Sequence, residues 1–298
     1  MAKKTGIITG GASGMGLETA KRLAARGDWN LHLVDLNPSA GKTALEAIPT
    51  ATFHQVNVTS YDSLSRAFQA VFDKDGRLDF VFANAGIVER SSFYEPAQTK
   101  GTEPPPEPNL ATLDVNMNAV VTTAYLAMHY MRLSPHKGKG AAIVMTASVG
   151  GLYPSEYTPI YAASKAGVVN LARSMAFPLH HSNGIRTYAI CPGTVRTNLL
   201  VSEDWDSFPP EYFTPVSKIA ATVEMLAEGG AMEDSAGRKV AAGEDFGLAV
   251  EICGEQHYFR DPVPFCNEEV AKVMAATSMS NQQAVFDKVK ERNAKVAG

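Results

Sequence analysis

The sequence predicts an α/β fold, a single doubly wound domain with a central parallel sheet and helices on both faces. Short apolar runs alternate with stretches of helical length along the 298 residues. The apolar runs are continuous, as expected for strands that helices cover on both faces. A glycine-rich turn joins the first apolar run to the first helical stretch. The expected strands are residues 6–9, 31–34, 80–83, 142–146, 187–190 and 248–252, and the expected helices are 15–26, 63–72, 110–133, 159–181 and 215–228.

The glycine-rich turn has the sequence TGGASGMG at residues 9–16. Glycines there let the backbone turn tightly and approach a pyrophosphate, whose charge the helix N-terminus stabilises. A purely structural turn is the alternative, and the position between an apolar strand and an amphipathic helix argues against it. The residues expected to bind a dinucleotide here are Gly10, Ala12, Ser13, Gly14, Met15 and Gly16.

An acidic residue, Asp35, ends the second expected strand, nineteen residues after Gly16. This is close to the spacing, about 20, of the acid that binds the ribose hydroxyls of a dinucleotide. A carboxylate there would repel a 2′-phosphate, residues 10–16 contain no Lys or Arg, and the next residue is Leu36. The sequence therefore predicts NAD as the cofactor, with NADP less favoured, and Asp35 and Leu36 among the residues that bind it. The alternative is a surface aspartate of a loop.

A serine, a tyrosine and a lysine form a candidate catalytic group. Ser148 lies just past the expected strand 142–146, and Tyr161 and Lys165 are one helical turn apart. A free tyrosine has a pKa near 10, but a neighbouring ammonium favours the phenolate. Ser148 can then hold a substrate oxygen while Tyr161 moves its proton. Without the glycine turn, an exposed helix face would explain the Tyr–Lys pair equally well.

Together these motifs resemble those of the short-chain dehydrogenase/reductase family over residues 5–252. The resemblance implies a Rossmann-type fold with Tyr161 as general acid/base and Ser148 as the group that orients the substrate oxygen. It implies that Lys165 lowers the pKa of Tyr161 and binds the nicotinamide ribose, and that Tyr161 also contacts the cofactor. Asn116 matches the asparagine that supports a proton relay in the family, with Asn118 as the alternative. The family's remaining cofactor motifs match Asn84, Ala85 and Gly86, and Pro192, Gly193, Val195 and Thr197.

The chain departs from the family pattern at two places. Asn57 and Val58 stand where the family usually has Asp-Val beside the adenine, so we expect binding there to survive in weaker form. The loop before Asn116 is long and rich in proline. The C-terminal end, 246–252, resembles the branch that contains hydroxyprostaglandin dehydrogenase, and the loop resembles uncharacterised fungal members.

We expect residues 1–253 to form one NAD-binding domain and 254–298 a C-terminal helical extension. The domain carries a Pro-rich loop at 89–109 and an aromatic segment at 198–214 that is expected to form a substrate lid. The lid aromatics, with Tyr153 and Tyr157, favour a bulky, apolar alcohol or ketone as substrate. The alternative is that they pack in a subunit interface or under the lid.

Composition narrows the partners and the location. There are 27 Lys and Arg against 31 Asp and Glu, a net charge of −4, and no basic cluster, so a nucleic-acid partner is not expected. No apolar run approaches the roughly 20 residues of a membrane span, and no signal peptide is apparent. Three Cys and seven His show no metal-ligand spacing, so no metal is expected. We expect a cytoplasmic protein, and the resemblance implies a homodimer or homotetramer formed through helices 110–133 and 159–181.

The expected reaction is reversible hydride transfer between nicotinamide and a secondary alcohol or ketone. Two alternatives remain at this point. One is an NADPH-dependent ketoreductase of a biosynthetic pathway, which NADH and NADPH binding would distinguish. The other is a non-catalytic dinucleotide-binding protein, in which replacing Tyr161 would leave the function unchanged.

Overall fold

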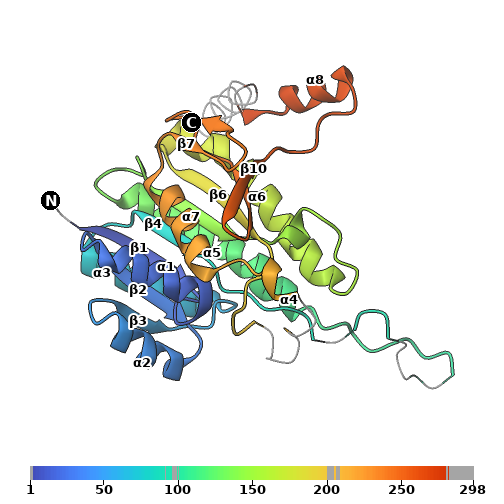
Figure 1. The fold of residues 1–298 in the computed structure, drawn as a ribbon, viewed down its shortest axis with the longest axis horizontal. Helices are drawn as coiled ribbons and strands as arrows, with labels where there is room; N and C mark the ends of the chain where they lie inside the picture. The colour runs from blue at the N-terminus through green and yellow to red at the C-terminus, as the bar shows by residue number, and fades with distance from the viewer. Residues whose placement is uncertain are drawn as a thin grey trace, which may run out of the picture. The chain divides into compact units, whose positions relative to one another are not determined.

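The computed structural model describes residues 3–90, 92–95, 99, 101–199, 205, 209–279 and 281. Its central feature, within these residues, is an eight-stranded sheet in the order β10-β9-β6-β5-β4-β1-β2-β3 (Figure 1). All neighbouring pairs are parallel except β9 and β10. The predicted α/β fold with a central parallel sheet is confirmed. The strands are β1 Lys4–Thr9, β2 Trp29–Asp35, β3 Thr52–Gln55, β4 Phe80–Ala83, β5 Ala142–Thr146, β6 Arg186–Pro192, β9 Ala249–Cys253 and β10 Gln256–Arg260, and β7 Met232–Glu233 pairs separately with β8 Lys239–Val240.

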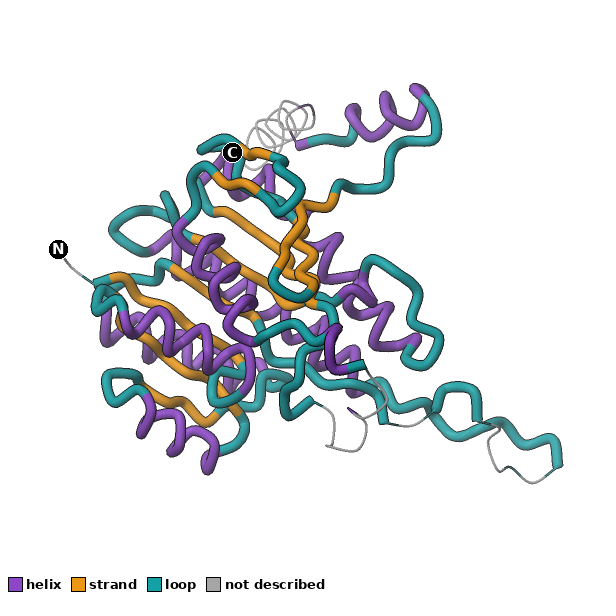
Figure 2. The backbone as a smooth tube through the Cα atoms, in the orientation of Figure 1, coloured by secondary structure: helices purple, strands orange, loops and turns teal. Residues whose placement is uncertain are grey.

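Helices cover both faces of the sheet (Figures 1 and 2). One face carries α1 Gly14–Ala25, α2 Pro38–Ala47 and α7 Val216–Glu228, and the other carries α3 Tyr61–Asp75, α5 Ala119–Leu133 and α6 Pro159–Asn183. Leu23 and Val223 pack under the first layer and Phe68 and Val168 under the second, all fully buried. Burial of such side chains on both faces explains why the strands read as continuous apolar runs.

Register brings the ends of the central strands to one edge. Thr9, the last residue of β1, lies opposite Val34 of β2 and Ala83 of β4. The next residues along these three segments are therefore neighbours in space: the glycine turn, Asp35 and the Asn84-Ala85-Gly86 segment. Ligands of doubly wound sheets bind at this carboxyl edge.

The long helix predicted at 110–133 is interrupted. It begins with α4 Ala111–Leu113, continues as a π-helical turn η1 at Asp114–Asn118, and only then becomes α5. One extra residue in such a turn rotates the side chains that follow, which is why π-turns occur frequently at functional sites. The apolar periodicity on which the prediction rests does not distinguish the two helix types.

Helix α2 and strand β3 are absent from the predicted elements, although Asn37 caps α2 by accepting from Ser39 and Ala40. Residues 256–260, which the sequence places in a helical extension, instead form β10. Gly254, with φ of 56°, turns the chain back so that β10 pairs antiparallel with β9.

The chain divides into two compact units, 1–260 and 261–298. The second contains the short helix α8 Glu268–Ala276, and the remainder of the expected helical tail lies outside the described residues apart from 277–279 and 281. None of the helices that the structure describes has the length and apolar character to cross a lipid bilayer.

Candidate active site

The glycine turn is packed so closely that larger residues do not fit. Gly10 has φ of 61°, and a Cβ atom there would lie 3.0 Å from the Cα of Ala85. A Cβ atom at Gly16 would overlap the carbonyl oxygen of Gly10. Asn84 holds the turn, because its Nδ2 donates to the carbonyl oxygens of Thr9 and Gly10 at 3.2 and 3.3 Å. The predicted Asn84-Ala85-Gly86 motif is therefore the support of the predicted glycine turn.

The N-terminus of α1 suits an anionic ligand. Ser13, at its N-cap, makes no side-chain capping bond within the described residues, and the first turn contains no acidic residue. The open N–H groups and the helix dipole together favour a phosphate there. Thr197 lies against this turn, since a Cβ atom at Gly14 would be 3.3 Å from its methyl group. These residues fit the pyrophosphate of a dinucleotide.

Asp35 lies between the glycine turn and the start of α2. Its Oδ2 accepts from Ala12 N and its Oδ1 accepts from Asn37 N, both at 3.1 Å. The following residue, Leu36, is exposed. The carboxylate is thus fixed at the edge where a ribose would lie beside the bound pyrophosphate.

The two residues predicted to lie beside the adenine, Asn57 and Val58, differ in their exposure. Asn57 is exposed, and its Oδ1 already accepts from the backbone N–H and the hydroxyl of Thr59 at 3.1 and 2.8 Å. Val58 is half-buried and packs against the core. An adenine amino group would have to compete for the Asn57 oxygen, which supports the expectation of a weaker contact.

Ser148, Tyr161 and Lys165 lie together at the carboxyl end of β5. Ser148 begins a short turn, η2 Val149–Gly151, where its Oγ accepts from Gly150 N at 3.1 Å. Lys165 Nζ lies 5.5 Å from the centre of the Tyr161 ring and donates to the carbonyl oxygen of Thr146 at 2.7 Å. The lysine is only 2% exposed, so an ammonium group is held inside the site.

Burial dominates the proton affinities of this group. It raises the pKa of Tyr161, against the lowering effect of a hydrogen bond with Ser148. It also lowers the pKa of Lys165 to about 8, while the nearby Cys191 thiol acts in the opposite direction. The sequence predicts that the ammonium favours the phenolate; in the chain by itself, desolvation raises the pKa of the phenol, and the opposing effect comes from the hydrogen bond with Ser148.

The structure brings Asn116, and not Asn118, to this group. Asn116 lies in the π-helical turn and is fully buried, and a Cβ atom at Gly86 would be 3.3 Å from its Oδ1 and 3.5 Å from Lys165 Nζ. Its Oδ1 accepts from Ile87 N at 2.9 Å, and its Nδ2 donates to Ile87 O at 2.8 Å. Asn118 is exposed and bonds to Asp114.

The last predicted cofactor segment follows β6. Pro192 ends the strand, and Gly193 N donates to Ile252 O of β9 at 2.8 Å. Val195 is buried in the core, which anchors the segment before it reaches Thr197. Apart from Tyr161 and Lys165 of α6, the predicted cofactor residues thus come from the carboxyl ends of β1, β2, β4 and β6 and the segment after β3, at one edge of the sheet.

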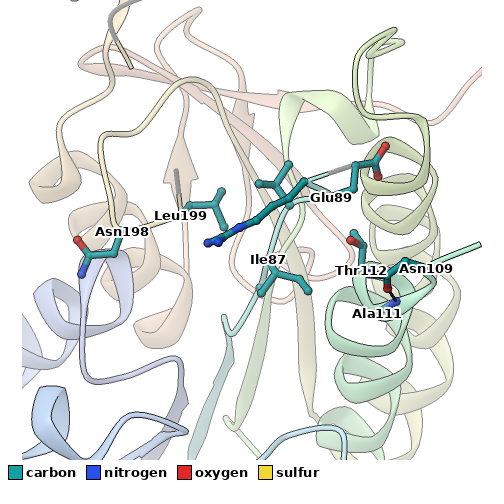
Figure 3. Close-up of a pocket in the computed structure, with 10 residues that line it drawn as sticks. Ile87, Glu89, Asn109, Ala111, Thr112, Asn198 and Leu199 are labelled. Atoms are coloured by element: carbon teal, nitrogen blue, oxygen red, sulfur yellow. Dashed lines mark hydrogen bonds between the residues drawn. The ribbon is translucent and has the colours of Figure 1, made fainter. Parts of the chain in front are cut away.

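A pocket of about 350 Å³ opens beside Gly86 (Figure 3). Figure 3 shows Ile87, Thr112 and Leu199 around it, from three separate segments of the chain. Its lining mixes apolar and polar side chains: Gly86, Ile87, Val88, Glu89, Arg90, Asn109, Ala111, Thr112, Asn198 and Leu199. A Cβ atom at Gly86 would lie 3.3 Å from Asn116 Oδ1 and 3.5 Å from Lys165 Nζ, so a ligand beside Gly86 would lie close to these two residues of the candidate catalytic group.

The predicted lid aromatics do not line this pocket within the described residues. Trp205 is buried against Phe213, with ring centres 5.8 Å apart, and Tyr212 is exposed. Tyr153 bonds to Glu251, and Tyr157 points to solvent. Residues 200–204 and 206–208 of the predicted lid lie outside the described residues. The alternative interpretation, packing beneath the segment itself, describes Trp205 and Phe213 better.

Glu89 is a residue of this region that no motif singles out. Its carboxylate accepts from the backbone N–H groups of Ile160 and Tyr161, 71 and 72 residues away in sequence. A contact over such a separation leaves no local pattern, so only the folded chain reveals it.

A family model described as short chain dehydrogenase matches residues 4–206. The short-chain dehydrogenase/reductase prx7 of Penicillium rubens is 49% identical over 276 residues, which cover 90% of this chain and 98% of that protein. Human 15-hydroxyprostaglandin dehydrogenase [NAD(+)] is 34% identical over 206 residues, 67% of this chain and 71% of that one.

Solved structures show the same fold. A 3-ketoacyl-(acyl-carrier-protein) reductase from Brucella melitensis, crystallised with NADH, superposes with a TM-score of 0.69. The match covers 85% of this chain and 98% of that chain at 24% sequence identity.

Proposed function

The chain belongs to the short-chain dehydrogenase/reductase family of oxidoreductases, and we propose that it is an NAD-dependent enzyme that interconverts a secondary alcohol and a ketone. The observation that carries this proposal is that Ser148, Tyr161 and Lys165 lie together at the carboxyl end of β5, and that Lys165 lies next to Gly86, which lines the pocket. A bound nicotinamide supplies the hydride acceptor and donor.

The chain's own residues handle the proton. Ser148 donates a hydrogen bond to the substrate oxygen and orients it. Tyr161 takes the hydroxyl proton in the oxidation and returns it in the reduction. Lys165 holds a buried positive charge 5.5 Å from the ring, which stabilises the phenolate as it forms. Asn116 connects this lysine region to the backbone of Ile87 and completes the proposed proton relay.

The proposed preference for NAD rests on Asp35. Its carboxylate faces the glycine turn and the start of α2, and would accept hydrogen bonds from ribose hydroxyls while repelling a 2′-phosphate. The name of the human relative includes NAD(+), which supports the same choice. The substrate is proposed to be a small-molecule alcohol or ketone. The lid aromatics favour a bulky, apolar one, whereas the mixed lining of the pocket favours a substrate that also carries polar groups.

The quaternary structure is also proposed. Helices α5 and α6 expose the apolar side chains Val121, Tyr125 and Phe177, which a second copy of the chain would cover in a homodimer or homotetramer. Sedimentation equilibrium of the purified protein would determine the number of chains.

The decisive experiment is Tyr161→Phe, which removes one hydroxyl. We expect turnover of 2-octanol, cyclohexanol or 1-phenylethanol, followed by NADH absorbance, to disappear while NADH still binds in a fluorescence titration. Tyr157→Phe is the matched control, because that ring is 92% exposed and four residues away. A Tyr161→Phe enzyme with normal turnover would contradict the proposal.

A further inference from the structure

Helix α6 carries Tyr161 in its first turn, but it has no cap from its own sequence. Within the described residues, Thr158 makes no side-chain capping bond to the helix, and its hydroxyl pairs instead with Ser155 at 2.8 Å. Pro159 has no N–H, and Ala162 N already donates to Thr158 O. The donors that the helix leaves open are therefore the N–H groups of Ile160 and Tyr161.

Glu89 accepts from both of these donors. Its Oε1 lies 3.3 Å from Ile160 N and its Oε2 lies 2.6 Å from Tyr161 N. A carboxylate at a helix N-terminus also interacts favourably with the helix dipole. The segment that follows β4 therefore supplies the N-terminal cap of helix α6, which carries Tyr161.

The same segment is tied to Tyr161 by a second route. Ser164 Oγ donates to the carbonyl oxygen of Tyr161 at 2.6 Å and accepts from Asn116 Nδ2 at 3.3 Å. Asn116 in turn binds both backbone groups of Ile87, two residues before Glu89. Together with the chain from Ile87 to Glu89, these hydrogen bonds form a closed ring. The ring holds the backbone of Tyr161 at both its N–H and its carbonyl group.

We propose that Glu89 is a positioning residue, which fixes the Tyr161 backbone and so sets the place of the phenol relative to Ser148 and Lys165. This inference rests on the proposed role of Tyr161 in proton transfer. Glu89 also lines the pocket, so the position of the substrate wall and the position of the tyrosine are determined by one side chain. Errors of about 1 Å in such an arrangement lower rates by up to about 100-fold.

Hydrogen–deuterium exchange tests, without a substrate, whether Glu89 caps the first turn of α6. First-turn amides of a helix have no acceptor inside the helix, so any protection of Ile160 and Tyr161 must come from Glu89. In Glu89→Ala we expect exchange at these two amides to accelerate at least about tenfold, as for loss of a hydrogen bond to a charged group. In Ser60→Ala, which removes the cap of α3, exchange should change at Ser63 and not at α6. Unchanged exchange at Ile160 and Tyr161 in Glu89→Ala would overturn the proposal.

Steady-state kinetics with the alcohols used for Tyr161→Phe test whether Glu89 positions Tyr161 for the reaction. We expect Glu89→Ala to lower kcat between about 10- and 100-fold, with the affinity for NADH unchanged. Glu89→Gln, which keeps one acceptor oxygen, should recover part of kcat. Ser164→Ala, which breaks the ring at the Tyr161 carbonyl, should lower kcat as well and serves if Glu89→Ala fails to fold.

The outcomes separate the two proposals. If Tyr161→Phe is inactive and Glu89→Ala turns over as fast as the wild type, the positioning role is wrong and the proposed function stands. A parallel loss of NADH affinity and kcat in Glu89→Ala would indicate general damage to the site and would also overturn the positioning role. If Tyr161→Phe is active, the proposed function fails, and the exchange experiment still decides whether Glu89 holds this backbone.

Discussion

The ammonium of Lys165 is buried and lies 5.5 Å from the centre of the half-buried Tyr161 ring. Its single hydrogen bond within the described residues goes to the carbonyl oxygen of Thr146, which ends β5. A charge so placed has few other groups to stabilise it, and its pKa falls to about 8. In the proposed mechanism, this ammonium stabilises the phenolate as the phenol ionises.

Replacing Lys165 by Met keeps the side-chain volume and removes the charge. We expect kcat for alcohol oxidation to fall at least about 100-fold, the usual contribution of a well-tuned general base. The rising limb of the pH–rate profile should move to higher pH, because the phenolate loses its neighbouring cation. Lys139→Met, at an exposed position, is the control. An unchanged pH profile in Lys165→Met would show that this lysine does not tune Tyr161.

Asp35→Ala tests the choice of cofactor. We expect NADH affinity to fall about 10- to 100-fold, as two hydrogen bonds to a carboxylate are lost, and the preference over NADPH to shrink. Isothermal titration with both cofactors measures the change. Asp62→Ala, in the exposed first turn of α3, should leave both affinities unaltered. Tighter binding of NADPH than of NADH by the unmodified protein would refute the assignment.

The two neighbouring asparagines should respond very differently to removal. Asn116→Ala removes a fully buried side chain that bonds to the N–H and carbonyl of Ile87 and to the Ser164 hydroxyl, so we expect a loss of about 1–3 kcal/mol in the free energy of unfolding. Turnover should decrease as well. Asn118→Ala removes only an exposed contact with Asp114 and should change neither quantity. Urea unfolding and steady-state rates measure both, and equal effects of the two substitutions would be incompatible with the relay role of Asn116.

A buried histidine pair predicts how stability depends on pH. His32 Nδ1 lies 2.9 Å from His54 Nε2, and His32 Nε2 lies 3.0 Å from Asp75 Oδ2. Burial, with a smaller effect of His32, lowers the pKa of His54 from 6.5 to about 4. Protons then bind the unfolded chain more readily between these values, so stability is complete above pH 6.5 and declines as pH falls toward 4.

Thermal unfolding between pH 4 and 7 measures this dependence. We expect the midpoint to fall with decreasing pH across the window, and His54→Asn to flatten the slope. His181→Asn, at an exposed position, should leave the slope as it is. A wild-type midpoint that stays constant from pH 6.5 to 4.5 would rule out the histidine contribution.

The sequence predicts most of the sheet because buried parallel strands leave continuous apolar runs that need no knowledge of partners. It misses β3, whose residues are only partly buried, and β10, whose pairing depends on a turn at Gly254. The site motifs lie on turns that follow strands, so the order of strands brings them together, while their roles stay predictions. The cap supplied by Glu89 and the ring of hydrogen bonds through Asn116 depend on contacts between distant segments, and no local pattern encodes them.

The Pro-rich loop runs from Glu89 to Asn109 and ends shortly before the π-helical turn that holds Asn116. Its first residue caps the helix of Tyr161, and its last residue precedes the segment that holds Asn116. Lengthening a surface loop costs little free energy, about 0.6 kcal/mol per doubling of its length. Arg90 and Asn109 of this loop line the pocket. We therefore expect insertions and exchanges between Glu89 and Asn109 to change which substrates the pocket admits, while the proposed proton transfer is unaffected.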